Sequence, residues 1–175
     1  MEARRAPRGA SAPRRDPMQQ ALDYLARRPR TVAEMRRHLA GRGHAGPALD
    51  EVIERLRRIG YLDDLAYTRK FAGWAASEKP MGRIRLQAEL AARGIDRQTI
   101  DRALGECFGP EQEAAALQSA LDRALHRSGR PPVDPAARRR LAARLMRRGF
   151  SAGRVHAALQ RPSGDADDET VPGQD

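Results

Sequence analysis

One short pattern occurs three times in this chain, and it constrains the fold more than any other feature. The sequence Leu-x-x-Arg-Gly ends at Gly43, at Gly94 and at Gly149. An apolar residue stands four positions before each leucine, and apolar residues follow each glycine at six and ten positions. Spacings of four are typical of helices, and a glycine between two helices is typical of a tight turn. A period of roughly 50 residues therefore predicts one helical unit that is used repeatedly.

Helix start and stop signals divide the chain further. Thr31 and Glu34 have the spacing of a capping box, and Pro47 suits the first turn of a helix. Asp96 and Asp134 are placed as N-caps. No stretch combines alternation of period two with β-branched residues, so we predict no sheet. The pattern predicts nine helices in three sets, and hence an all-α fold.

A three-helix set of about 45 residues buries little surface against the entropy of ordering its backbone, so we expect the sets to stack on one another. We predict three tandem three-helix, helix-turn-helix-like repeats. Their predicted boundaries are 17–62, 63–109 and 110–161, between a disordered basic tail at 1–16 and a disordered acidic tail at 162–175. The run Gly129–Pro132 should interrupt the third repeat.

Positive charge is concentrated between the tails. The formal net charge is +10, of which residues 1–16 contribute +3 and residues 162–175 contribute −5, so that +12 remains for residues 17–161. A basic domain of this kind usually binds a polyanion, most often nucleic acid. Only Lys70 and Lys79 are lysines, and the other 31 cations are arginines. The codon usage of a GC-rich genome explains arginine in place of lysine, but not the excess of cations over acids.

The sequence gives little support to an enzyme. The four histidines include no pair at i, i+4 and have no set of cysteine partners, and the chain has no Gly-rich phosphate loop. Asp63 and Asp64 are adjacent near a helix start, where capping explains them better than a carboxylate pair does. We therefore expect no catalytic, cofactor or metal site.

The same chain carries no signal for a membrane or for export. No apolar run approaches the ~20 residues that cross a bilayer. The arginine-rich N-terminus lacks the apolar segment of a secretory signal. Cys107 is the single cysteine and has no internal disulfide partner. We expect a cytoplasmic protein.

Three further segments give the chain a family resemblance. Residues 60–67 read Gly-Tyr-Leu-Asp-Asp-Leu-Ala-Tyr, residues 82–86 read Gly-Arg-Ile-Arg-Leu, and residues 89–95 read Glu-Leu-Ala-Ala-Arg-Gly-Ile. In this order and spacing they resemble the RecX family of bacterial recombination regulators. The likeness covers residues 18–160 and is strongest from Ala21 to Leu104. Thr68 stands where the family often has alanine, and the Pro-rich run at Gly129–Pro132 and both tails are particular to this chain.

The resemblance implies an elongated, curved molecule of tandem three-helix repeats that acts without a cofactor. It implies binding to the RecA recombinase filament on single-stranded DNA, within the helical groove of the filament. It further implies inhibition of the ATPase and strand-exchange activities of the filament, and so a role in recombinational repair and the SOS response. We expect a monomer that contacts the recombinase and the DNA phosphates.

The best binding candidates are arginines that lie off the apolar stripes. Arg83 and Arg85 fall in a basic motif of the family, and superposition of the repeats through their leucines places them at Arg138 and Arg140. The middle helices of adjacent repeats would then present one basic track. The full predicted set is Arg36, Arg37, Arg83, Arg85, Arg138, Arg139, Arg140, Arg144 and Arg147. A solvated charged face remains the alternative for each of them.

Two other groups have simpler explanations. Arg42, Arg93 and Arg148 each precede a turn glycine, where a cation near the helix C-terminus is worth ~0.3–1 kcal/mol, so we interpret them as caps. Tyr67, Phe71 and Trp74 follow helical spacing, so we predict that they belong to the core and do not stack on bases. Affinity for DNA should then come mostly from contacts with phosphates, and it should depend strongly on salt concentration.

Two alternative functions stay open. A sequence-specific helix-turn-helix transcription factor would read the major groove with the third helix of one repeat. Those helices begin Ala-Leu-Asp-Glu at residue 48 and Asp-Arg-Gln-Thr at residue 96, and the first of these is acidic and apolar. A helical-repeat scaffold for an acidic protein would not bind DNA at all.

Overall fold

The structure is a computed structural model that describes residues 16–128 and 134–160. Within these two ranges, all regular secondary structure is helical, and nine helices follow one another in the chain. The all-α class and the tandem three-helix organisation predicted from the sequence are confirmed. The two predicted tails, apart from Asp16, and the run Gly129–Pro132 lie outside the described residues. No helix of the described part is long and apolar enough to cross a membrane.

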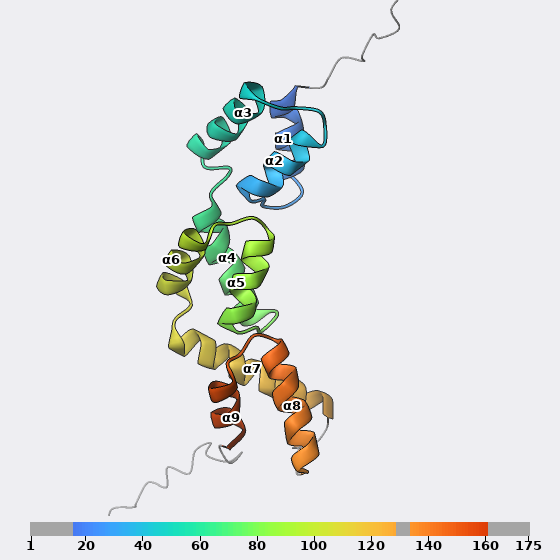
Figure 1. Cartoon of the computed structure of the whole chain (residues 1–175), viewed down its shortest axis with the longest axis vertical. Coiled ribbons are helices and arrows are strands. Elements are labelled where there is room, and N and C mark those ends of the chain that lie inside the picture. The colour runs from blue at the N-terminus through green and yellow to red at the C-terminus, as the bar shows by residue number, and fades with distance from the viewer. Residues whose placement is uncertain (1–15, 129–133, 161–175) are drawn as a thin grey trace, which may run out of the picture. The chain divides into compact units, whose positions relative to one another are not determined.

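Of the described residues, 16–64 form the first of two compact units. The unit contains α1 (Pro17–Leu25), α2 (Val32–Ala40) and α3 (Pro47–Arg58), which are blue to cyan in Figure 1. All three helices contact one another. Their apolar faces form one core, whose fully buried members are Ala21, Met35, Leu39, Ile53 and Leu56.

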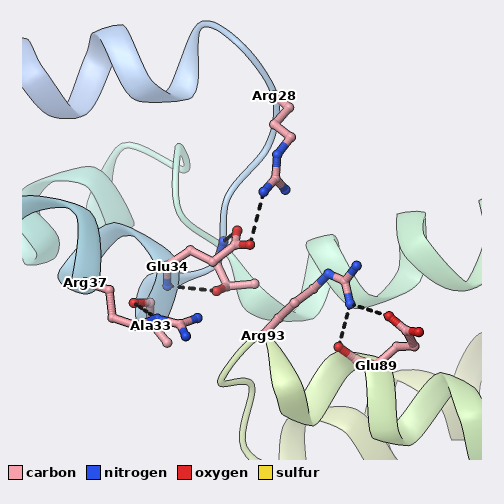
Figure 2. A network of polar contacts seen from close by, with 7 residues as sticks. Arg28, Ala33, Glu34, Arg37, Glu89 and Arg93 are labelled. Carbon is pink, nitrogen blue, oxygen red and sulfur yellow. Dashed lines mark hydrogen bonds and ion pairs between the residues drawn. The ribbon is translucent and has the colours of Figure 1, made fainter.

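Local signals fix the ends of α2 as predicted. The Thr31 hydroxyl accepts a hydrogen bond from the Glu34 amide at 3.1 Å, and the Glu34 carboxylate accepts one from the Thr31 amide at 3.3 Å. The Arg28 guanidinium pairs with the same carboxylate at 3.3 Å, as Figure 2 shows. At the other end α2 stops at Ala40, and Gly43 in the turn that follows has a φ of 86°, a value that favours glycine.

The second unit comprises the described residues from Leu65 onward. Its helices are α4 (Asp64–Ser77), α5 (Arg83–Ala92), α6 (Arg97–Cys107), α7 (Pro110–Ser128), α8 (Pro135–Arg147) and α9 (Ala152–Gln160). The predicted caps of α6 and α8 are present: Asp96 accepts from the Thr99 amide and Asp134 from the Ala136 amide. Both α8 and α9 pack against α7 (Figure 1).

The second and third repeats share one core. Leu86, Leu90 and Leu104 of the second repeat belong to the same buried cluster as Leu117 and Leu145 of the third. The predicted burial between stacked repeats is therefore present for the second and third repeats, whereas the first repeat has a core of its own.

The structure corrects the prediction for the α4 aromatics. Tyr67 and Phe71 are partly buried against the second core, but Trp74 is 44% exposed. The buried face of α4 consists of Thr68, Ala72 and Ala75, which lie one position further along the helix. The aromatic side chains therefore lie at the edge of the buried face and not within it.

Candidate nucleic-acid interface

The interface candidate is built around the third glycine turn, which joins α8 to α9. The carbonyls of this turn meet the start of α5: the Gly82 amide donates to the Arg148 carbonyl at 2.9 Å, and the Ile84 amide donates to the Gly149 carbonyl at 3.3 Å. These bonds satisfy amides that the first turn of a helix leaves unpaired. A Cβ atom on Gly149 would lie 2.4 Å from the Cβ of Arg85. Glycine is therefore required here by close approach of two backbones.

This junction gathers arginines from three helices. Arg148 donates to the Pro80 carbonyl at 3.5 Å, and Arg85 donates to the Arg147 carbonyl at 3.3 Å. Arg123 of α7 donates to the carbonyls of Ser77 and Glu78 at 2.6 and 2.7 Å, at the end of α4. We call Arg85, Arg123, Arg127, Arg144 and Arg148 the turn cluster.

The positive charges of the turn cluster act on one another. The pKa of Arg148 is lowered from its ordinary value, first by burial and then by the positive charges of Arg144, Arg127, Arg123 and Arg85. In the described chain, the only carboxylate paired with a member of the turn cluster is Glu89, whose oxygen lies 3.4 Å from Arg85. Glu89 also binds Arg93 at 3.0 Å (Figure 2). The cluster therefore retains a net positive charge that an external anion would stabilise.

A row of arginines extends from the turn cluster along α8. Arg140, Arg144 and Arg147 lie at i, i+4 and i+7, so they share one helix face, and all three are exposed. We call them the α8 stripe. Arg140 lies 4.0 Å from Asp134, and within the described ranges Arg144 and Arg147 have no side-chain hydrogen bond or ion pair. Arg138 and Arg139 are exposed on the same helix. The α8 arginines predicted from the sequence are thus at the surface.

The sequence predicted that Arg83 and Arg85 occupy positions equivalent to those of Arg138 and Arg140. In the structure, Arg83 and Arg85 have different partners from each other. The Arg83 guanidinium donates to the Leu104 carbonyl at 3.2 Å and to the Phe108 carbonyl at 2.9 Å, which holds the end of α6 against the start of α5. Arg83, predicted as a binding residue because it lies off the apolar stripe, therefore has a structural role within the protein. Arg85 points into the turn cluster. Of the two predicted second-repeat arginines, the structure brings only Arg85 to the third-repeat arginines.

This role of Arg83 gives a stability prediction. Replacing Arg83 with alanine should lower the free energy of unfolding by about 2 kcal/mol, because it removes charge-assisted bonds to two partly buried carbonyls. Arg139→Ala removes an exposed arginine and should change the same quantity by less than about 0.5 kcal/mol. Urea unfolding followed by circular dichroism compares the two variants. Equal stability of both would contradict a structural role for Arg83.

Arg36 and Arg37 belong to the first unit. Arg36 forms an ion pair with Asp50 at 2.5 Å, and the Arg37 Nε donates to the Ala33 carbonyl at 3.3 Å (Figure 2). Both side chains are exposed, but the charge of Arg36 already has a partner within the protein. Their part in binding stays a prediction.

Sequence reasoning missed Arg123 and Arg127, and it interpreted Arg148 only as a cap. Both α7 arginines lie off the Leu117–Leu121–Leu125 stripe, a signal that was available in the sequence. The capping interpretation is confirmed for Arg93, which donates to the Glu89 carbonyl at 2.6 Å. The other two turn arginines have different partners: Arg42 donates to Gln20 and Arg148 to Pro80.

An open groove of about 430 Å³ lies next to the turn cluster. It runs between α5 and the end of α8, and Ile84 and Met146 are exposed on it at 60% and 39%. Its lining comprises Ile84, Arg85, Ala88, Glu89, Ala92, Met146, Arg147 and Gly149. Exposed apolar side chains beside arginines are typical of surfaces that bind proteins.

The described residues offer little for bond-making chemistry. They contain no group of three or more histidine, cysteine or acidic side chains that could hold a metal ion. The pKa of the half-buried Cys107 thiol is raised, mainly by burial, so the thiol is not activated as a nucleophile. Asp64 accepts the Val32 amide at 3.0 Å, which is a structural role.

Tandem three-helix units with a basic surface define a class of helical-repeat binding proteins. Residues 18–56 match the family model of the first three-helix domain of RecX, and residues 63–104 match that of the second. The regulatory protein RecX of Xanthomonas campestris (strain B100) is 32% identical over 154 residues, which cover 87% of this chain and 91% of that protein. The chain belongs to the RecX family of regulatory proteins.

Two further comparisons agree. The regulatory protein RecX of Geobacillus thermodenitrificans is 33% identical over 151 residues, and this match covers 86% of the chain but only 55% of the longer relative. The crystal structure of RecX from Lactobacillus salivarius superposes with a TM-score of 0.69 at 19% identity, over 82% of this chain and 92% of that one. The likeness to this crystal structure supports the all-α repeat fold.

Proposed function

We propose that this chain binds the RecA recombinase filament on single-stranded DNA and inhibits its ATPase and strand-exchange activities. It would thereby modulate recombinational repair and the SOS response, acting as a monomer in the bacterial cytoplasm. Membership of the RecX family supports a regulatory role. The observation that carries the contact with DNA is the turn cluster, where five arginines meet one carboxylate.

The proposed mechanism is steric and electrostatic. The turn cluster and the α8 stripe bind DNA phosphates, while the groove beside Ile84 and Met146 receives an apolar side chain of a recombinase protomer. A molecule held at both places would oppose the movements that ATP turnover and strand pairing require. Arginine suits the phosphate contacts because its planar guanidinium binds two phosphate oxygens at once.

The test is ATP hydrolysis by the recombinase on single-stranded DNA, titrated with this protein at two salt concentrations. Inhibition should weaken at the higher salt, because each phosphate contact releases counterions on binding. The protein should also bind the recombinase–DNA complex more tightly than either component alone. Preference for one duplex sequence would instead favour the transcription factor, and indifference to nucleic acid would favour the scaffold.

The groove gives a prediction that separates the two contacts. Ile84→Asp places a carboxylate at the mouth of the groove and should raise the concentration needed for half-maximal ATPase inhibition at least 10-fold, the loss typical of an interface hot spot. Ile84 is 60% exposed, so the variant should stay folded. Its affinity for an oligothymidylate, measured by fluorescence anisotropy, should change less than about 3-fold, the factor expected for one extra surface charge. Full inhibition by the variant would exclude the groove from the contact.

A further inference from the structure

The connection between α1 and α2 buries an arginine that has no acidic partner. Arg30 is only 9% exposed, and its Cζ lies 3.7 Å from the centre of the Tyr24 ring. Its Nε is buried without a hydrogen-bond partner, and within the described residues its guanidinium has no ion pair. Buried cations are nearly always paired, because one aromatic contact does not replace their hydration. This arginine therefore requires an explanation.

The opposite face of Tyr24 is covered as well. The His38 ring stacks on it with a centroid distance of 3.8 Å and an angle of 1° between the planes. Two groups this close to one ring centre cannot share a face, so Arg30, Tyr24 and His38 form a three-layer stack. The stack fixes the position of the Arg30 guanidinium, since the rings come from two packed helices, α1 and α2.

Two more arginines lie close enough to this stack for their charges to act on His38. The pKa of His38 is lowered by burial and then by Arg42, Arg30 and Arg27, and among the described residues no carboxylate contributes to the shift. The nearby acids are engaged elsewhere: Glu34 pairs with Arg28 and caps α2, and Asp23 accepts a hydrogen bond from Gln19. Arg42 makes one long bond of 3.5 Å to Gln20, and Arg27 is exposed.

We propose that Arg27, Arg30 and Arg42 form a binding site for a phosphate group, with the Tyr24–His38 stack as its wall. Three guanidiniums offer several charge-assisted donors to one oxyanion, and the bound anion would supply the negative charge that Arg30 lacks. The phosphate could be that of a DNA backbone or a free phosphate. The site uses no residue of the turn cluster or of the α8 stripe, so it stands independently of the proposed contact there.

Thermal unfolding of the full chain tests the site. Inorganic phosphate, compared with chloride at equal ionic strength, should raise the Tm of the wild type by ~3 °C more than that of Arg30→Gln. Arg58→Gln removes one exposed arginine from α3 of the same unit and should respond like the wild type. An equal rise in all three proteins would be a general salt effect and would overturn the proposal.

His38 provides a second readout, by NMR titration of its ring. A phosphate bound near the stack should raise the pKa of His38 by roughly half a unit in the wild type and in Arg58→Gln, but not in Arg30→Gln. Inorganic phosphate and an oligothymidylate are tested separately. A response to the oligonucleotide alone supports a DNA phosphate, and a response to both supports a site for phosphate of either source. No response to either would refute the site.

A replacement variant covers the case in which Arg30→Gln does not fold. The double variant Arg27→Gln/Arg42→Gln keeps the three-layer stack and removes the two flanking guanidiniums, so it should also lose the phosphate response. If it keeps the full response, the proposal is wrong. Filament inhibition is tested separately, with a variant of the α8 stripe. Failure of the phosphate site would therefore not imply failure of the proposed function, and the reverse also holds.

Discussion

Replacing Gly149 with alanine should lower the free energy of unfolding of the second unit by about 3 kcal/mol. Two costs combine at this position. Its φ of +86° costs a residue with a side chain about 1–2 kcal/mol. The new methyl group would also overlap the backbone and Cβ of Arg85, from which it would lie only 2.4 Å away, and such overpacking typically costs 1–3 kcal/mol.

Two other glycines serve as matched controls. Gly60 of the first unit also has a positive φ, of 77°, but a Cβ there would meet nothing within 4 Å, so Gly60→Ala should show only the backbone cost, in the unfolding of that unit. Gly153 lies in the first turn of α9 with open space around it, and Gly153→Ala should stabilise the helix by at most about 0.5–1 kcal/mol. Urea unfolding ranks the three variants. If Gly149→Ala is no less stable than Gly60→Ala, the close contact between α5 and the turn does not exist as described.

Removing the α8 stripe should weaken binding to single-stranded DNA about 10- to 100-fold at 0.1 M salt. The triple variant Arg140→Gln/Arg144→Gln/Arg147→Gln deletes three exposed cations without touching the buried face of α8. Each lost phosphate contact should reduce the slope of log K against log salt by about 0.7, and hence by about 2 in total. The protein concentration needed for half-maximal ATPase inhibition should rise by the same factor.

The control for this prediction removes the same number of charges elsewhere. Arg55, Arg58 and Arg97 are exposed arginines outside α8, and their triple glutamine variant has the same net charge as the stripe variant. If net charge alone governs binding, the two triple variants should behave alike. Anisotropy measured at four salt concentrations distinguishes them. An unchanged salt slope in the stripe variant would remove α8 from the proposed DNA contact.

Most of the fold could be predicted because its signals are local. The Thr31–Glu34 capping box, the N-caps Asp96 and Asp134, and the positive-φ turn at Gly43 each depend on residues within a few positions of one another. Trp74 shows the limit of this reasoning. Its spacing from Phe71 is helical, but the buried face of α4 is offset by one position and consists of Thr68, Ala72 and Ala75.

The candidate site was predictable only in part, because its geometry comes from contacts across the chain. Arg83 and Arg85 are two positions apart and look alike in sequence, yet Arg83 binds carbonyls at the end of α6 while Arg85 faces α8. Arg123 joins the turn cluster through the end of α4, 45 residues away in the chain. Arg30 gave no sequence signal, since its burial depends on how α1 packs against α2.

The composition of the turn cluster has a consequence for control inside the cell. All five of its cations are guanidiniums, and the lysines of the whole chain are only Lys70 and Lys79. Guanidiniums stay charged throughout the physiological pH range and are not substrates for lysine acetylation, which neutralises ammonium groups. The attraction of this surface for polyanions is therefore a constant property of the molecule, which cells can modulate through ionic conditions and protein abundance but not through acetyltransferases.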